Sequence, residues 1–182
     1  NMKKKILILG LMILGISSAM AADLRLIHVP GIHSVGARVG TALFNTWDVG
    51  VNYNYCFHRR WVFNTGVDYE QGLFGQSLYR GITLSPGVEC AVWQPCSWLF
   101  LNLTANANIA WDEWEYKTFT NVEDAFSVGG SVGFNLEAYV SRQISILLSA
   151  AQNFMYRCET PTLNGEFYCR PLFSLGVRAH IR

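Results

Sequence analysis

The sequence predicts an all-β fold, an eight-stranded antiparallel up-and-down transmembrane β-barrel of the outer-membrane type. Three observations lead to this prediction. Apolar and polar residues alternate with a period of two over most of the chain, which is typical of strands with two different faces. Only 15% of the 182 residues are charged, whereas about a quarter are charged in a typical soluble domain. The chain also starts with the pattern of a secretory signal peptide.

That N-terminal pattern has three parts. Lysines at positions 3–5 form a positive region, residues 6–16 an apolar run, and Ala19-Met20-Ala21 a small-residue cleavage site. A transmembrane anchor is the alternative, but the apolar run is shorter than the roughly 20 residues needed to cross a bilayer. We therefore expect three regions: a signal peptide over residues 1–21, a periplasmic segment over 22–30 and a barrel over 31–182.

Four strands are predicted in the first half of the chain. The clearest is 47–58, where one face carries Trp47, Val49, Val51, Tyr53, Tyr55 and Phe57, and the other carries Asp48, Gly50, Asn52, Asn54, Cys56 and His58. Only a strand separates two such sets. The same alternation predicts strands over 31–44, 61–71 and 81–92.

Four more strands follow in the second half. Alternation predicts them over 98–111, 125–140, 144–156 and 169–181. The third of these is the least regular, because Leu147 and Met155 break the alternation, which a β-bulge would explain.

The predicted connections alternate in length. Three are short, at residues 59–60, 94–97 and 141–143, and three are longer, at residues 72–80, 112–124 and 157–168. Outer-membrane barrels have short periplasmic turns and long extracellular loops. This asymmetry predicts that both ends of the mature chain lie in the periplasm.

Alternation alone does not say which face points outward, and a soluble lipocalin-like barrel with an apolar interior is the alternative. The polar face is mostly Gly, Ser, Thr and Asn, which suits a crowded lumen better than a solvated surface. Aromatic residues gather at strand ends, as an interfacial girdle requires. They are Trp47, Phe57, Trp61, Tyr69, Trp93, Trp111, Phe126 and Tyr156. We therefore expect the apolar face to meet the lipid bilayer.

Four charged residues are predicted to face the lumen: Arg38, Glu89, Glu137 and Arg178. Buried charges need partners, so we expect these side chains to form a charge network. The network is interpreted as a structural plug, because eight strands leave a narrow lumen. A gate or a proton path is the alternative.

No catalytic, metal or cofactor site is predicted. The histidines, His28, His33, His58 and His180, fall at the predicted periplasmic end or before the first strand. A barrel enzyme acting on lipid or peptide would need an acid near the extracellular rim, such as Asp68 or Glu70. The pair Cys56 and His58 is weak evidence for a metal. No phosphate-binding loop and no cationic stripe for nucleic acid is found, and no small-molecule substrate is indicated.

The five cysteines suggest one disulfide. Cys158 and Cys169 flank the last long loop, so a bridge closing that loop is expected in an oxidising compartment. At most one pair can form among Cys56, Cys90 and Cys96, because their number is odd.

The connection over 112–124 is a candidate docking loop. Its aromatic residues Trp114, Tyr116 and Phe119 lie among acidic residues, a composition that suits a protein contact. A solvated hairpin tip is the alternative.

Several short motifs resemble the TraO family of conjugative transposon proteins from Bacteroides-type bacteria. The motifs are Asp124-Ala125-Phe126, Gly129-Gly130, Leu136-Glu137-Ala138-Tyr139-Val140 with Arg142, Pro30-Gly31, and Trp61-Val62-Phe63 leading to Asp68-Tyr69. The resemblance implies a non-enzymatic role in a transfer apparatus at the outer membrane, with other transfer proteins as partners. A general surface barrel for adhesion or envelope stability is the alternative.

Overall fold

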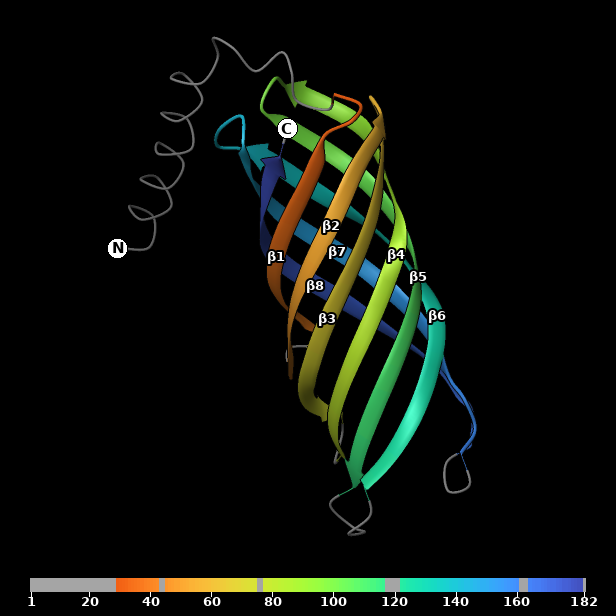
Figure 1. The fold of residues 1–182 in the computed structure, drawn as a ribbon. Coiled ribbons are helices and arrows are strands. Elements are labelled where there is room, and N and C mark those ends of the chain that lie inside the picture. Colours follow the sequence, from red (N-terminus) through yellow and green to blue (C-terminus); the bar gives the residue numbers. More distant parts are fainter. Residues whose placement is uncertain (1–28, 43–44, 75–76, 117–121, 161–163, 182) are drawn as a thin grey trace, which may run out of the picture.

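A computed structural model describes residues 29–42, 45–74, 77–116, 122–160 and 164–181 of the chain. The expected signal peptide lies outside the described residues, as does most of the segment 22–30. The described chain forms eight β-strands that close into one barrel (Figure 1). The strands are β1 His33–Ala42, β2 Thr46–His58, β3 Trp61–Phe74, β4 Ser77–Cys96, β5 Leu99–Tyr116, β6 Val122–Tyr139, β7 Ile144–Arg157 and β8 Glu166–Ile181.

Each strand pairs antiparallel with the next, and β1 pairs antiparallel with β8 to close the barrel. The predicted fold class is thereby confirmed. We call the end with the connections at residues 59–60, 97–98 and 140–143 the turn end, and the opposite end the loop end. The start of β1 and the end of β8 lie at the turn end (Figure 1).

The apolar face of the barrel points outward. Val39 and Trp111 are each 59% exposed and Leu148 is 56% exposed, whereas polar residues of the opposite parity such as Asn54 and Asn102 are buried. This arrangement is the reverse of a soluble barrel, in which the apolar face fills the interior. The described residues include no helix long and apolar enough to cross a membrane.

Several strands run further than predicted. Most of the expected loops 72–80 and 112–124 is strand, because alternation and ladder pairing continue beyond the predicted ends. The expected loop 157–168 is shortened only at its two ends, where β7 reaches Arg157 and β8 begins at Glu166. A bulge does not explain the irregular alternation of β7, since both of its ladders keep register. Leu147 and Met155 instead lie buried in the lumen as apolar side chains. Register shifts occur at the turn end, between Cys56 and His58 and between Ala91 and Cys96.

Candidate functional site

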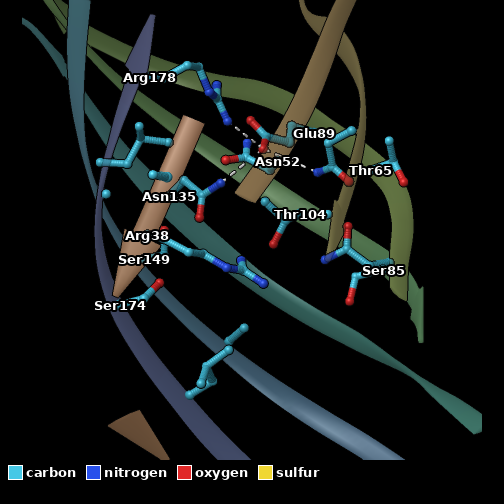
Figure 2. A pocket seen from close by; sticks show the side chains of 18 of the residues that line it. Arg38, Asn52, Thr65, Ser85, Glu89, Thr104, Asn135, Ser149, Ser174 and Arg178 are labelled. Atoms are coloured by element: carbon cyan, nitrogen blue, oxygen red, sulfur yellow. Dashed lines mark hydrogen bonds and ion pairs between the residues drawn. The ribbon is translucent and has the colours of Figure 1, made fainter. Parts of the chain in front are cut away.

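The lumen holds a buried ion network in its turn-end half. Arg178 on β8 reaches across the barrel: its Nη2 lies 2.9 Å from Glu89 Oε1 on β4, and its Nη1 lies 3.4 Å from Glu137 Oε2 on β6. Nη2 also donates a hydrogen bond to Asn54 Oδ1 on β2, at 3.2 Å. Arg178, Glu89 and Glu137 are at most 3% exposed. We call these three residues the turn-half network; Figure 2 shows Arg178 beside Glu89.

Neutral donors also contact these two carboxylates, although Glu89 Oε2 has no hydrogen-bond partner among the described residues. Asn64 and Asn135 each donate to Glu89 Oε1 at 3.2 Å. On the neighbouring carboxylate, Asn102 donates to Glu137 Oε2 at 3.2 Å and Ser145 donates to Oε1 at 2.7 Å. Two carboxylates therefore share one arginine because amide and hydroxyl dipoles supply the rest of the compensation.

Arg38 lies apart from this network. Its guanidinium pairs with Asp68 on β3, with Nε 2.7 Å from Oδ1. Arg38, Gly50 and Asp68 are in register on three consecutive strands. A Cβ atom at Gly50 would lie 1.7 Å from Asp68 Oδ1, so the absence of a side chain on β2 lets Arg38 reach over it. Of the four predicted residues, the structure brings three together and gives the fourth a different partner.

A polar cavity of about 60 Å³ lies between the turn-half network and the Arg38–Asp68 pair. Figure 2 shows side chains that surround it, among them Asn52, Thr65, Ser85, Thr104 and Ser149. The space suffices for water, and the lining offers the polar partners that buried water needs.

A second ion network occupies the loop-end half, and its make-up was not predicted. Arg170 on β8 pairs with Glu70 on β3, with Nη1 2.8 Å from Oε2, and donates from Nη2 to the Tyr79 hydroxyl at 3.2 Å. Tyr79 in turn donates to Asp112 Oδ1 at 2.8 Å. The guanidinium carbon lies 5.0 Å from the ring centroid of Tyr79 and 5.5 Å from that of Tyr168. We call Arg170, Glu70, Tyr79 and Asp112 the loop-half network.

Aromatic side chains pack against or within the networks at both ends of the lumen. At the loop end, the rings of Tyr79 and Trp114 are 4.9 Å apart. At the turn end, Phe100 and Tyr139 meet edge to face at 5.6 Å, and Tyr139 stacks on His180 at 5.0 Å. The lumen is thus filled in layers, with polar and charged groups held between aromatic ones.

The prediction that Trp114 belongs to an exposed docking loop is wrong. Trp114 is 7% exposed and faces the lumen, where Arg157 lies over its ring at 5.2 Å. Strand β5 continues to Tyr116, so the inward parity of Asp112 extends to Trp114. The Tyr116 side chain and Phe119 lie outside the described residues.

The predicted disulfide is wrong. Cys158 and Cys169 are free thiols, as are the other three cysteines. Cys169 lies opposite Phe154 in the β7–β8 ladder. Phe154 is four residues from Cys158, a separation of roughly 13 Å along a strand. A disulfide needs Cα atoms within about 7 Å of each other.

The acids and the histidine considered for chemistry make other contacts. Asp68 and Glu70, the acids considered for a barrel enzyme, are paired with arginines. His180 Nε2 lies 3.0 Å from the Ser145 hydroxyl and 3.5 Å from Glu137. Both contacts use the same ring nitrogen, whereas a Ser-His-acid triad places serine and acid on opposite nitrogens.

The other histidines stay apart from that pair. His33 contacts the Tyr53 hydroxyl, His58 is exposed, and His28 is outside the described range. In the part of the chain that the structure describes, no group of three His, Cys, Asp or Glu side chains is placed to hold a metal ion.

No protein-family model matches the chain, and no curated protein matches it either. Solved structures of outer-membrane barrels do match. The N-terminal β-barrel domain of OprF from Pseudomonas aeruginosa is 12% identical with a TM-score of 0.61, and the match covers 84% of this chain and 98% of that one. Neisserial surface protein A is 10% identical with a TM-score of 0.58, covering 81% and 94%.

A major outer membrane protein from Thermus thermophilus is 11% identical with a TM-score of 0.56, covering 82% of this chain and 98% of that one. Identities this low show a shared fold and nothing more. Together with the outward apolar face and the polar lumen, they establish that this chain has the fold of the small eight-stranded outer-membrane barrels.

Proposed function

We propose that the protein spans the outer membrane of a Gram-negative bacterium as a barrel with a plugged lumen, and that its role is structural or interactive and non-enzymatic. The observation that carries this proposal is the turn-half network. Arg178 joins β8 to β2, β4 and β6 across the lumen, while apolar side chains cover the outside.

A plug is favoured over a gate because breaking the turn-half network requires a large free energy. Withdrawing Arg178 would leave two carboxylates without their cation in a low-dielectric interior, and breaking a single buried ion pair already costs about 3–5 kcal/mol. The loop-half network adds a second obstacle further along the lumen. Two such layers must open together for ions to pass.

The plug is tested by single-channel recording in planar lipid bilayers. We expect the wild-type barrel to show no large, steady conductance. The double variant Arg178→Ala/Arg170→Ala should conduct, because both layers lose their arginine, whereas the exposed-site control Arg59→Ala should behave as wild type. A large, steady wild-type conductance would contradict the plug.

Within this frame we propose that the barrel serves a conjugative transfer apparatus, with both mature termini in the periplasm and other transfer proteins as partners. The support is the resemblance of its short motifs to the TraO family. A clean deletion, complemented in trans, should lower the frequency of DNA transfer. An undiminished frequency would contradict this role. The orientation would be contradicted by an epitope tag after the last strand that is accessible on intact cells.

A general surface role in adhesion or envelope stability is the second candidate. It is favoured by fold likeness to Ail, the attachment invasion locus protein of Yersinia pestis, which is 11% identical with a TM-score of 0.53 over 84% of this chain and all of that one. The same deletion strain separates the two roles. Normal transfer combined with detergent sensitivity or lost surface attachment would favour this candidate.

A further inference from the structure

Exposed charges are sorted between the two ends of the barrel. Among the residues that the structure describes, every exposed carboxylate lies at the loop end: Glu115, Asp124, Glu159 and Glu166. The fully exposed arginines of the same residues, Arg59, Arg60 and Arg142, lie at the turn end. Arg80, half-exposed at the loop end, is paired with Glu113. The turn end therefore presents only positive formal charge to its surroundings over the described chain.

Arg59 and Arg60 stand on a well-anchored turn between β2 and β3. The Arg60 carbonyl accepts a hydrogen bond from Ala91 N on β4 at 2.8 Å, and Arg60 N lies 3.4 Å from His58 Nδ1. Neither guanidinium forms an ion pair with a described residue. Two adjacent, exposed cations thus stand on an anchored turn without an ion-pair partner among the described residues.

Aromatic side chains surround this turn on the outer face. Phe57 is 49% exposed, Trp61 43% and Trp93 59%, and these residues lie at the turn ends of β2, β3 and β4. Exposed Trp and other aromatic residues at strand ends mark the depth of lipid headgroups. In a bilayer, a turn just beyond Phe57 and beside Trp61 would place Arg59 and Arg60 near the headgroup phosphates.

We infer that Arg59 and Arg60 bind the headgroup phosphate of an anionic phospholipid, of the phosphatidylglycerol class, in the leaflet at the turn end. This inference rests on the proposed membrane-spanning role. Guanidinium matches phosphate geometry with two parallel hydrogen bonds. A lipid fits better than an acidic protein because Arg142, on the β6–β7 turn, is four strands away in a closed ring of eight and so lies on the opposite side. Lipids surround a barrel on all sides, whereas a single partner covers one.

Native mass spectrometry of the barrel released from nanodiscs tests the site. The nanodiscs contain equal amounts of phosphatidylglycerol and phosphatidylcholine with the same acyl chains. Wild-type barrel should retain phosphatidylglycerol preferentially. Each basic residue near an anionic surface contributes about 1 kcal/mol, so Arg59→Gln/Arg60→Gln should reduce that preference at least fivefold. Arg80→Gln, which removes a half-exposed arginine at the loop end, is the matched control and should keep it.

Three results would overturn the lipid site. They are equal retention of the two lipids by wild type, an equal loss in Arg80→Gln, and retention of lipid A in place of phosphatidylglycerol when both are supplied. Insertion is checked first in vesicles of pure phosphatidylcholine by β-sheet circular dichroism. A chain that does not insert there contradicts the membrane-spanning proposal and this inference with it, whereas insertion without lipid preference contradicts the site alone.

Discussion

The two buried networks of the lumen hold their arginines in different ways. In the turn half, Arg178 contacts two carboxylates directly, and side-chain amides donate further hydrogen bonds to both of them. In the loop half, Arg170 contacts one carboxylate and reaches Asp112 only through the Tyr79 hydroxyl, while two aromatic rings cover the guanidinium. The first network depends on its cation for charge balance. In the second, Arg170 is stabilised by Glu70 and also by the rings of Tyr79 and Tyr168 and the Tyr79 hydroxyl. The loss of each arginine should therefore have different consequences.

The largest effect is expected from Arg178→Met, which removes the cation between Glu89 and Glu137. A buried carboxylate left without its partner costs about 3–5 kcal/mol, and because two are left here we expect a loss near 5 kcal/mol in the free energy of unfolding. Urea titration in detergent micelles, followed by tryptophan fluorescence, measures it. Arg59→Met is the exposed control and should change stability by less than about 0.5 kcal/mol. A loss below 2 kcal/mol would show that the remaining contacts, among them Ser145 and His180 at Glu137, can stabilise both carboxylates.

Arg170→Met should cost less, about 3 kcal/mol, because it leaves only Glu70 without its direct ion-pair partner. Loss of the cation–π contacts with Tyr79 and Tyr168 contributes to this value. The same urea titration measures this loss, which is compared with the loss in free energy of unfolding found for Arg178→Met. If Arg170→Met destabilised the barrel more than Arg178→Met, the proposed difference between the networks would be reversed.

Gly50→Ala perturbs the Arg38–Asp68 pair, which lies between the two networks. Its methyl group would overlap Asp68 Oδ1 and displace the Arg38–Asp68 pair, and overpacking of this kind costs about 1–3 kcal/mol. We expect a loss near 2 kcal/mol in the titration. Gly66→Ala is the control, because there the nearest atom to an added Cβ is 3.4 Å away. Equal losses in both variants would indicate a general intolerance of side chains on these strands.

The smallest effect should come from Tyr79→Phe, which keeps the ring beside Arg170 and Trp114 and removes the hydroxyl. The hydrogen bonds to Asp112 and from Arg170 are lost, at a cost of about 1–2 kcal/mol. Tyr156→Phe on the lipid-facing side is the control, expected to be nearly neutral. A Tyr79→Phe loss as large as that of Arg170→Met would show that the phenol, and not the arginine, organises the loop half.

Alternation in the sequence was sufficient to place most side chains inside or outside the barrel. The inward position of Arg178, Glu89 and Glu137 follows from strand parity alone, and these three residues meet in the structure. Glu70 and Arg170 also have inward parity, so the same signal could have indicated the loop-half network. The partner of Arg38 could not be found in this way, because contact across a lumen depends on the stagger of non-adjacent strands.

Errors arose where polar composition was interpreted as the end of a strand. The acidic run around Trp114 suggested a loop, yet parity continues through it: Asp112 and Trp114 face inward while Glu115 is exposed. A strand outside the lipid layer has no need of an apolar outer face, so its composition changes while its geometry does not. The disulfide was predicted wrongly because Cys158 and Cys169 flank the same loop in sequence. In the β7–β8 ladder Cys169 lies opposite Phe154, four residues from Cys158.

The sequence by itself determined the strand number, the up-and-down order and the two faces, because a period of two leaves each residue only one of two directions. The tertiary structure decided which inward charges meet, where the aromatic layers close the lumen, and which cysteines stay apart. Those outcomes depend on the closure of β1 on β8 and on the register of all eight ladders. Closure and register fix distances across the barrel, and no local pattern in one strand encodes such a distance.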